Sequence, residues 1–324
     1  MKPLVTVLTP VYNGEEFLVE CIESVLRQTY ENIEYIIVNN CSKDGTMDIA
    51  LEYAAKDPRV RVHSNDKFVG VIENHNIAFG LISAATKYCK VVSADDFIFP
   101  DCISQMVEVA ESHPTAGFVG CYQISEKSVK WQGFPYPQTL IPGRELCREI
   151  FLRCDASFGF GTPTSLMYRA DMLRSTEKFY PNPSPHADTS ACFKHLKDWD
   201  FAFIYQVLSF ERIHQQTQSS ASGDLNRYSS AYLNDVQEYG GWYLDEAEYR
   251  HVLRDVLNSY FEFLAVSVNR FRDREFWKYH KSRLKELGHP VSAWKLLVAG
   301  TRRILREIVN PGQALRKSQK RLFS

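Results

Sequence analysis

The sequence lacks any long uninterrupted run of hydrophobic residues. No segment reaches the roughly 18 apolar residues that a helix needs to cross a bilayer. Met1, Lys2 and Pro3 lead directly into a strand-like run, without the charged and apolar regions of a secretory signal. We therefore expect a cytoplasmic protein. Its 324 residues, 44% of them hydrophobic, are enough for a large buried core.

Clustered cysteines, a strong net charge and a glycine-rich first turn are also missing. The eight cysteines include no Cys-x-x-Cys pair, so the sequence indicates neither a zinc site nor a disulfide scaffold. A formal net charge of −1 argues against a dedicated nucleic-acid binder, which would be strongly basic. The turn after the first strand-like run contains no Gly-x-Gly-x-x-Gly, which argues against a dinucleotide-dependent oxidoreductase.

Positive charge is concentrated at the end of the chain. Between residues 291 and 324, eight lysines and arginines stand against Glu307 alone. They interleave with large apolar residues such as Trp294, Leu297 and Leu305, which fits a basic amphipathic helix lying on an anionic membrane surface. The alternative is a helix that packs on the rest of the protein and leaves its arginines in solvent.

The first hundred residues alternate strand-like and helix-like segments. Apolar and β-branched runs at 4–8, 33–38, 60–63 and 90–93 predict strands, and helical periodicity predicts helices at 17–26, 46–55 and 77–85. This order is typical of βαβ units and predicts an α/β fold with a mostly parallel central sheet flanked by helices. In such sheets ligands bind beyond the carboxyl ends of the strands.

The second half of the chain is less regular. It predicts strands at 117–123, 164–168 and 206–210 and helices at 143–153, 189–196 and 249–268. The polar stretch at 219–222 is a plausible boundary. We therefore expect one domain at 1–222, with halves at about 1–115 and 116–222, and a helical C-terminal region at 223–324.

Three polar clusters follow the predicted strands. They are Thr-Pro-Val-Tyr-Asn-Gly at 9–14, Asn-Asn-Cys-Ser-Lys-Asp-Gly-Thr at 39–46 and Ser-Ala-Asp-Asp at 93–96. An aromatic ring, amides and adjacent carboxylates suit a nucleobase, a ribose and a metal-bound diphosphate. Each cluster alone is also ordinary turn or helix-cap chemistry, and the two aspartates could belong to a solvated loop.

In this order the clusters resemble the opening of family 2 glycosyltransferases. The similarity covers about residues 4–115, including Ser-Val-Leu-Arg-Gln-Thr-Tyr at 24–30, and a looser match runs from 161 to 214. The resemblance implies a GT-A fold, a nucleotide-diphosphate sugar donor and a divalent metal, Mn²⁺ or Mg²⁺.

The resemblance also implies roles for individual residues. The donor-binding residues carried over by position are Pro10, Tyr12, Asn39, Asn40, Asp95 and Arg212. The metal ligands are Asp96, Asp95 and His214, with Asp96 as the expected main ligand. Asn39 and Asn40 stand where the family commonly has two aspartates, so the nucleobase of the donor is left unassigned. Ser93 replaces an aspartate that is often the first residue of the third cluster.

Asp188 is the predicted catalytic base. In inverting members of the family an aspartate in the second half takes the proton from the acceptor hydroxyl, and Asp188 directly precedes a predicted helix. It could instead merely cap that helix. Arg212 and His214 resemble the Arg/His segment that comes late in the family's sequences and approaches the diphosphate or the metal. The alternative is that they belong to a charged loop without such a role.

The resemblance therefore implies a metal-dependent inverting glycosyltransferase. Its acceptor would be a saccharide or a lipid-linked molecule, and its process polysaccharide or glycolipid biosynthesis at the inner face of a membrane. The alternatives are a non-catalytic scaffold that binds nucleotide sugars and a sugar nucleotidyltransferase. The latter would need a glycine-rich basic loop where Pro10 to Asn13 stand.

Overall fold

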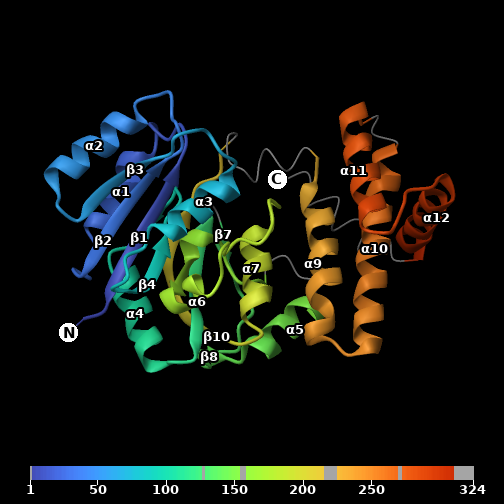
Figure 1. Ribbon diagram of the computed structural model, residues 1–324. Coiled ribbons are helices and arrows are strands. Elements are labelled where there is room, and N and C mark those ends of the chain that lie inside the picture. Colours follow the sequence, from blue (N-terminus) through green and yellow to red (C-terminus); the bar gives the residue numbers. More distant parts are fainter. Residues whose placement is uncertain (1, 126–127, 154–157, 215–224, 269–271, 310–324) are drawn as a thin grey trace. The chain divides into compact units, whose positions relative to one another are not determined.

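The structure, a computed structural model, describes residues 2–125, 128–153, 158–214, 225–268 and 272–309. The chain divides into two compact units, residues 1–220 and 221–324. The first unit is built on a sheet flanked by helices, and the second consists of helices (Figure 1).

The first four long strands form the parallel part of the sheet. These are β1 (Leu4–Val11), β2 (Ile33–Asn39), β3 (Val60–Ser64) and β4 (Thr86–Val91), in the order β3-β2-β1-β4. Val7 and Leu8 of β1 point to opposite faces and are both fully buried, because helices cover the sheet on both sides. The predicted α/β fold is therefore confirmed.

Three helices connect these strands. They are α1 (Leu18–Leu26), α2 (Thr46–Lys56) and α3 (Val71–Gly80). The helix expected at 77–85 begins six residues earlier than its apolar pattern indicated. Its first turns carry Glu73, Asn74 and His75, and the buried Asn74 occupies a position where an apolar residue would have revealed the helix.

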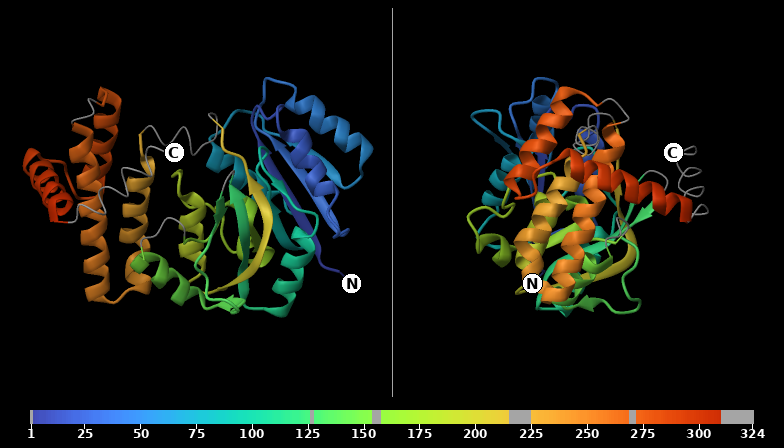
Figure 2. Two further views of the ribbon diagram at one scale, coloured as in Figure 1. Left: turned by 180° about the vertical axis from the view of Figure 1, so that it is seen from behind. Right: turned by 90° about the vertical axis from the view of Figure 1, so that its right-hand side faces the viewer.

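Beyond β4 the sheet becomes mixed. The strands are β5 (Phe97–Ile98), β6 (Ala116–Ser125), β7 (Ser128–Lys130), β8 (Leu140–Ile141), β9 (Leu166–Arg169) and β10 (Asp200–Glu211). β9 runs antiparallel between β4 and β6, whereas β10 lies parallel to β6. The long β10 is the golden strand in the left view of Figure 2. The short 3-10 helix η1 (Pro163–Ser165) precedes β9 directly. The remaining helices of this unit are α4 (Cys102–Ser112), α5 (Gly143–Arg153), α6 (Ala170–Arg174) and α7 (Ala187–His195).

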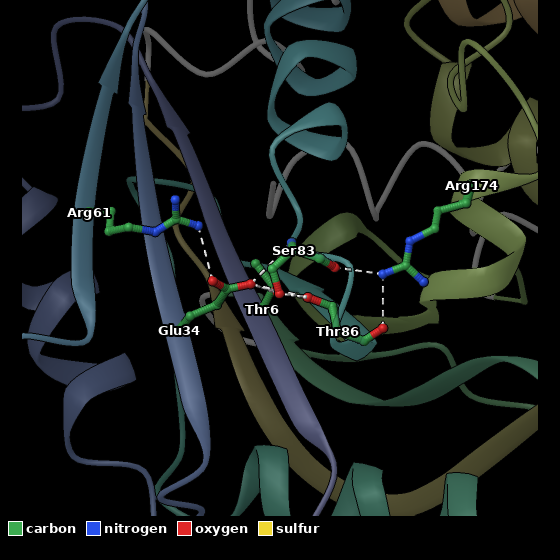
Figure 3. A network of polar contacts seen from close by, with 6 residues as sticks. All are labelled: Thr6, Glu34, Arg61, Ser83, Thr86 and Arg174. Atoms are coloured by element: carbon green, nitrogen blue, oxygen red, sulfur yellow. Dashed lines mark hydrogen bonds and ion pairs between the residues drawn. The ribbon is translucent and has the colours of Figure 1, made fainter.

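A network of polar contacts connects the parallel strands near their amino ends (Figure 3). Glu34 Oε1 accepts hydrogen bonds from Thr6 Oγ1 at 2.5 Å and Thr86 Oγ1 at 3.1 Å, and Arg61 lies 3.0 Å from Oε2. Arg174 donates to the carbonyl oxygens of Ser83 and Thr86. The network ties β1, β2, β4 and α6 together at the edge opposite the strands' carboxyl ends.

The second unit contains four described helices, α9 (Arg227–Tyr243), α10 (Glu246–Val268), α11 (Arg274–Glu286) and α12 (Ala293–Val309). α12 approaches α10 through small residues: Ala299 is buried, and a Cβ added at Gly300 would lie 3.8 Å from the Cβ of Ala265. Among the described residues, no helix is both long and apolar enough to cross a membrane.

Candidate functional site

The loops after β1 and β2 interlock at the carboxyl edge of the sheet. The Asn13 backbone N–H donates to Ser42 Oγ at 2.9 Å, and Lys43 N–H donates to Asn13 Oδ1 at 2.8 Å. The Gly14 N–H donates to Thr46 Oγ1 at 2.8 Å. The first two polar clusters are therefore in direct contact, as their positions after neighbouring strands required.

Two exposed aromatic rings meet beside this junction. Tyr12 and Phe68 are 44% and 60% exposed, and their ring centroids lie 4.7 Å apart in an edge-to-face arrangement. Phe68 was not among the predicted site residues, because none of the three polar clusters includes the loop after β3. Pro10, in contrast, is buried within β1, opposite Val38 of β2.

The paired amides are buried and engaged with neighbouring loops. Asn40 donates from Nδ2 to the Val69 carbonyl at 2.8 Å and accepts from the Val69 N–H at 3.0 Å, so it holds that residue's backbone at both ends. Asn65 Nδ2 links Asn40 Oδ1 to Asn74 Oδ1 of α3. Asn39 accepts from the Ser42 N–H at 3.1 Å. Both amides thus shape the loops that carry the exposed rings.

Asp95 and Asp96 point in different directions. Asp96 is buried, and its two oxygens accept hydrogen bonds from Thr164 Oγ1 at 2.5 Å and from the Arg212 backbone N–H at 3.0 Å. Burial, together with the charge of Asp95, raises the pKa of Asp96 to about 8, although both hydrogen bonds oppose the shift. Asp96 therefore joins the loop after β4 to η1 and to the end of β10.

Asp95 instead faces Arg212 and His214, which we call the late Arg/His segment. Its Oδ2 lies 3.0 Å from His214 Nε2, and its carbonyl oxygen accepts from Arg212 Nε at 3.1 Å. Two residues of the first loop and α1 support this segment. The Arg212 guanidinium lies 4.7 Å from the ring centroid of Phe17 and donates to Glu20 at 2.5 Å, while Phe17 also packs on the His214 ring.

The Asp95–His214 pair fits a divalent cation. Two ligands bound at right angles, each about 2.1 Å from an ion, are themselves about 3.0 Å apart. Carboxylate and imidazole together suit Mn²⁺, and phosphate oxygens and water commonly complete such a site. Within the described ranges, no group of three or more His, Cys, Asp or Glu side chains is placed to hold a metal ion.

Asp188 lies in the first turn of α7 rather than at its N-cap. His186 occupies the N-cap position, and Asp188 Oδ1 accepts from the N–H of Thr189 at 2.8 Å. Burial raises the pKa of the Tyr180 hydroxyl, and the nearby charge of Asp188 adds to this shift. Tyr180 in turn exchanges two backbone hydrogen bonds with the Asn76 amide of α3. The same helix thus contacts the amide network through Asn74 and the Asp188 region through Asn76.

The sequence is similar to that of known glycosyltransferases. A sequence model of glycosyl transferase family 2 matches residues 6–176. An uncharacterized glycosyltransferase of Rickettsia prowazekii is 37% identical over 241 residues, covering 71% of each chain. Another, from Haemophilus influenzae, is 36% identical over 191 residues, covering 57% of this chain and 58% of the relative. The chain covers 58%, 30%, 42% and 34% of the first four curated relatives that it matches.

Solved structures with low sequence identity share the fold. TarS 1–349 of S. aureus in complex with UDP-GlcNAc superposes with a TM-score of 0.64 at 17% identity, covering 89% of this chain and 80% of TarS 1–349. The mannosyltransferase PcManGT of Pyrobaculum calidifontis, in complex with GDP-Man and Mn²⁺, gives 0.58 at 14% identity, covering 100% and 86%. The likeness confirms a GT-A type fold. On the family match and the Rickettsia relative, the chain belongs to glycosyl transferase family 2.

Proposed function

We propose that this protein is a metal-dependent inverting glycosyltransferase that takes a sugar from a nucleotide-diphosphate donor. One observation carries the proposal: Tyr12 and Asp95 follow the neighbouring parallel strands β1 and β4, and His214, which follows β10, lies 3.0 Å from Asp95. The donor class is supported by the relatives, since TarS was solved with UDP-GlcNAc and PcManGT with GDP-Man.

The nucleoside end of the donor would bind against Tyr12 and Phe68. Both rings are exposed, and an aromatic face can stack on a base of either kind. We assign Asn39 and Asn40 a positioning role, because their side chains are buried and hold the loops of Ser42 and Val69. On this view residues 1–115 form the donor half, and residues 116–222 supply the acceptor side.

The diphosphate end would lie at Asp95 and His214. These residues, rather than the inward-facing Asp96, are proposed to hold one Mn²⁺ or Mg²⁺ ion. The ion would neutralise charge on the departing diphosphate. Arg212, whose side chain already reaches Asp95 and Glu20, would contribute positive charge at the same end.

Asp188 would act as the general base. In an inverting transfer, the acceptor hydroxyl oxygen attacks the anomeric carbon while the bond from that carbon to the diphosphate oxygen breaks. The hydroxyl proton passes to the Asp188 carboxylate, and the nucleoside diphosphate leaves with the bonding electrons. We propose a saccharide or lipid-linked acceptor in polysaccharide or glycolipid assembly.

Helix α12 is proposed to bring the protein to the inner surface of a membrane as a peripheral protein. Its small residues face α10, whereas Trp294, Leu297 and Leu305 are more than half exposed. Lys295 and Arg302 stand on the same helix, so an anionic bilayer matches both the apolar and the charged parts of this surface.

A donor screen tests the central proposal. Nucleoside diphosphates and their sugar conjugates are added with and without Mn²⁺, and both the melting temperature and the release of free nucleotide are measured. A glycosyltransferase should show metal-dependent stabilisation and slow metal-dependent hydrolysis of one donor. Stabilisation without any nucleotide release would favour the scaffold instead, and no response to any nucleotide would refute both.

A further inference from the structure

Lys90 is a fully buried lysine in β4, next to the candidate site in the fold. Its Nζ donates to three backbone carbonyl oxygens, those of Val91 at 3.2 Å, Leu166 at 3.0 Å and Thr164. No carboxylate forms an ion pair with it in the part of the chain that the structure describes. The three carbonyls take up the three hydrogens of the ammonium group.

Burying an amine in this way is costly. Moving an ammonium group from water into a protein interior costs several kcal/mol, and burial accordingly lowers the pKa of Lys90. A methionine of similar length would fill the same space without that cost. The contacts of Lys90 therefore require an explanation other than core packing.

These contacts cross-link η1 to β4. Thr164 is the middle residue of η1 and Leu166 directly follows it, so the ammonium group holds this turn and the start of β9. Thr164 is fully buried, and its Oγ1 donates to Asp96 Oδ2 at 2.5 Å and accepts from the Ser93 N–H at 3.1 Å. The turn thereby fixes the loop after β4 at two points.

The same loop holds the late Arg/His segment. Asp96 Oδ1 accepts from the Arg212 N–H at 3.0 Å, and His214, two residues further, faces Asp95. Lys90 is thus connected to Arg212 by three successive hydrogen bonds: Lys90 to Thr164, Thr164 to Asp96, and Arg212 to Asp96. Each of them joins residues that are far apart in the sequence. Displacing η1 would remove the Thr164 hydroxyl from Asp96 Oδ2 and so loosen the contact of Asp96 with the backbone that leads to His214.

Building on the proposed function, we propose that Lys90 is a positioning residue of the metal site, which holds Thr164 against Asp96 and so keeps Asp95 and His214 together. It touches neither donor nor metal. Its effect reaches the site through η1 and the Asp96 carboxylate.

Two variants and one matched control test this role. Lys90→Met removes the ammonium group at similar volume, and Thr164→Val removes only the hydroxyl that reaches Asp96. Thr86→Val is the control, because Thr86 is also a buried polar residue of β4, but its partners are Thr6 and Glu34 at the far end of the strand. If Lys90→Met does not fold, Lys90→Gln replaces it, since its amide cannot serve three carbonyls.

The first readout needs no metal. Amide hydrogen exchange at Arg212 should accelerate about tenfold in Lys90→Met and Thr164→Val, because the Arg212 N–H depends on Asp96, and should stay unchanged in Thr86→Val. Unchanged exchange at Arg212 in Lys90→Met would overturn the proposal. This result is independent of whether the protein transfers sugar.

The second readout is the Mn²⁺ concentration that half-saturates donor hydrolysis. It should rise about tenfold in Lys90→Met and Thr164→Val, while kcat at saturating Mn²⁺ stays near that of the wild type. A lower melting temperature with unchanged Mn²⁺ dependence would reduce Lys90 to a structural residue and overturn the proposal. A wild type without any Mn²⁺ response would refute the proposed function, while the exchange at Arg212 would still decide the role of Lys90.

Discussion

His214 Nε2 lies 3.0 Å from Asp95 Oδ2, although 119 positions separate the two residues in the sequence. One follows β4 and the other follows β10, and the loop contact between Asp96 and Arg212 brings them together. A carboxylate and an imidazole at this separation form the cation site that we propose.

Removing the imidazole should weaken metal binding. We expect His214→Ala to raise the Mn²⁺ concentration needed for half-maximal donor hydrolysis by about tenfold or more, because the proposed imidazole ligand is lost. His113→Ala provides a control, since His113 lies after α4 and contacts Thr139. Equal Mn²⁺ dependence of His214→Ala and the wild type would exclude His214 as a ligand.

Neutralising the predicted base should separate donor binding from transfer. We expect Asp188→Asn to lower kcat by roughly 10²–10⁴-fold, because the amide cannot accept the hydroxyl proton, and to leave the melting shift with donor unchanged. Asp171→Asn, in α6 and paired with Arg174, is the matched control. Near-normal turnover in Asp188→Asn would remove the assignment.

The ring of Phe68 should contribute to donor affinity. Phe68→Ala removes the edge-to-face partner of Tyr12 and one exposed aromatic face, and we expect a loss of about 1 kcal/mol, or roughly fivefold in Kd for the nucleoside diphosphate. Isothermal titration measures this loss. Leu51→Ala, also an exposed apolar residue but on α2, should have no effect. If the two variants bind equally well, the rings do not form the nucleoside site.

The parallel half of the fold follows from the sequence, whereas parts of the site do not. Runs such as 4–8 and 33–38 carry the apolar pattern of strands covered on both faces, and the structure confirms them. Pattern cannot tell which of two adjacent aspartates turns inward, because that depends on Thr164, 68 positions away. It also cannot reveal Lys90 as buried, since its partners are backbone carbonyls that any sequence would offer.

A buried histidine should make the helical unit sensitive to acid. His280 Nε2–H donates to the Leu225 carbonyl at 2.8 Å, so Nδ1 accepts from Tyr260 Oη at 2.6 Å, and the ring is neutral in this arrangement. Burial lowers its pKa to about 4. Because the unfolded chain takes up the proton at about pH 6.5, stability is complete above that pH and is lost as the pH falls toward 4.

The expected loss between pH 7.5 and 5.0 is on the order of 2 kcal/mol in the free energy of unfolding. His280→Leu should be less stable at pH 7.5 but should lack this part of the pH dependence. Urea unfolding of both proteins at the two pH values measures the difference. Burial also lowers the pKa of His195 to about 4, but His195 contributes equally to the pH dependence of the wild type and of His280→Leu. Identical pH slopes would show that His280 is not responsible.

Truncation after Pro290 should abolish binding to anionic vesicles. It removes α12, whose Trp294 and Leu297 are 71% and 61% exposed, together with its basic residues. Co-sedimentation with phosphatidylserine-containing liposomes is the measurement, and neutral liposomes are the control. Arg302→Glu with Arg303→Glu should weaken binding while leaving the apolar side chains in place, since each basic residue near such a surface contributes about 1 kcal/mol. If the truncated protein sediments with the liposomes like the full chain, a different part of the molecule binds the bilayer. The exposed face of α12 would then not be the membrane-binding surface.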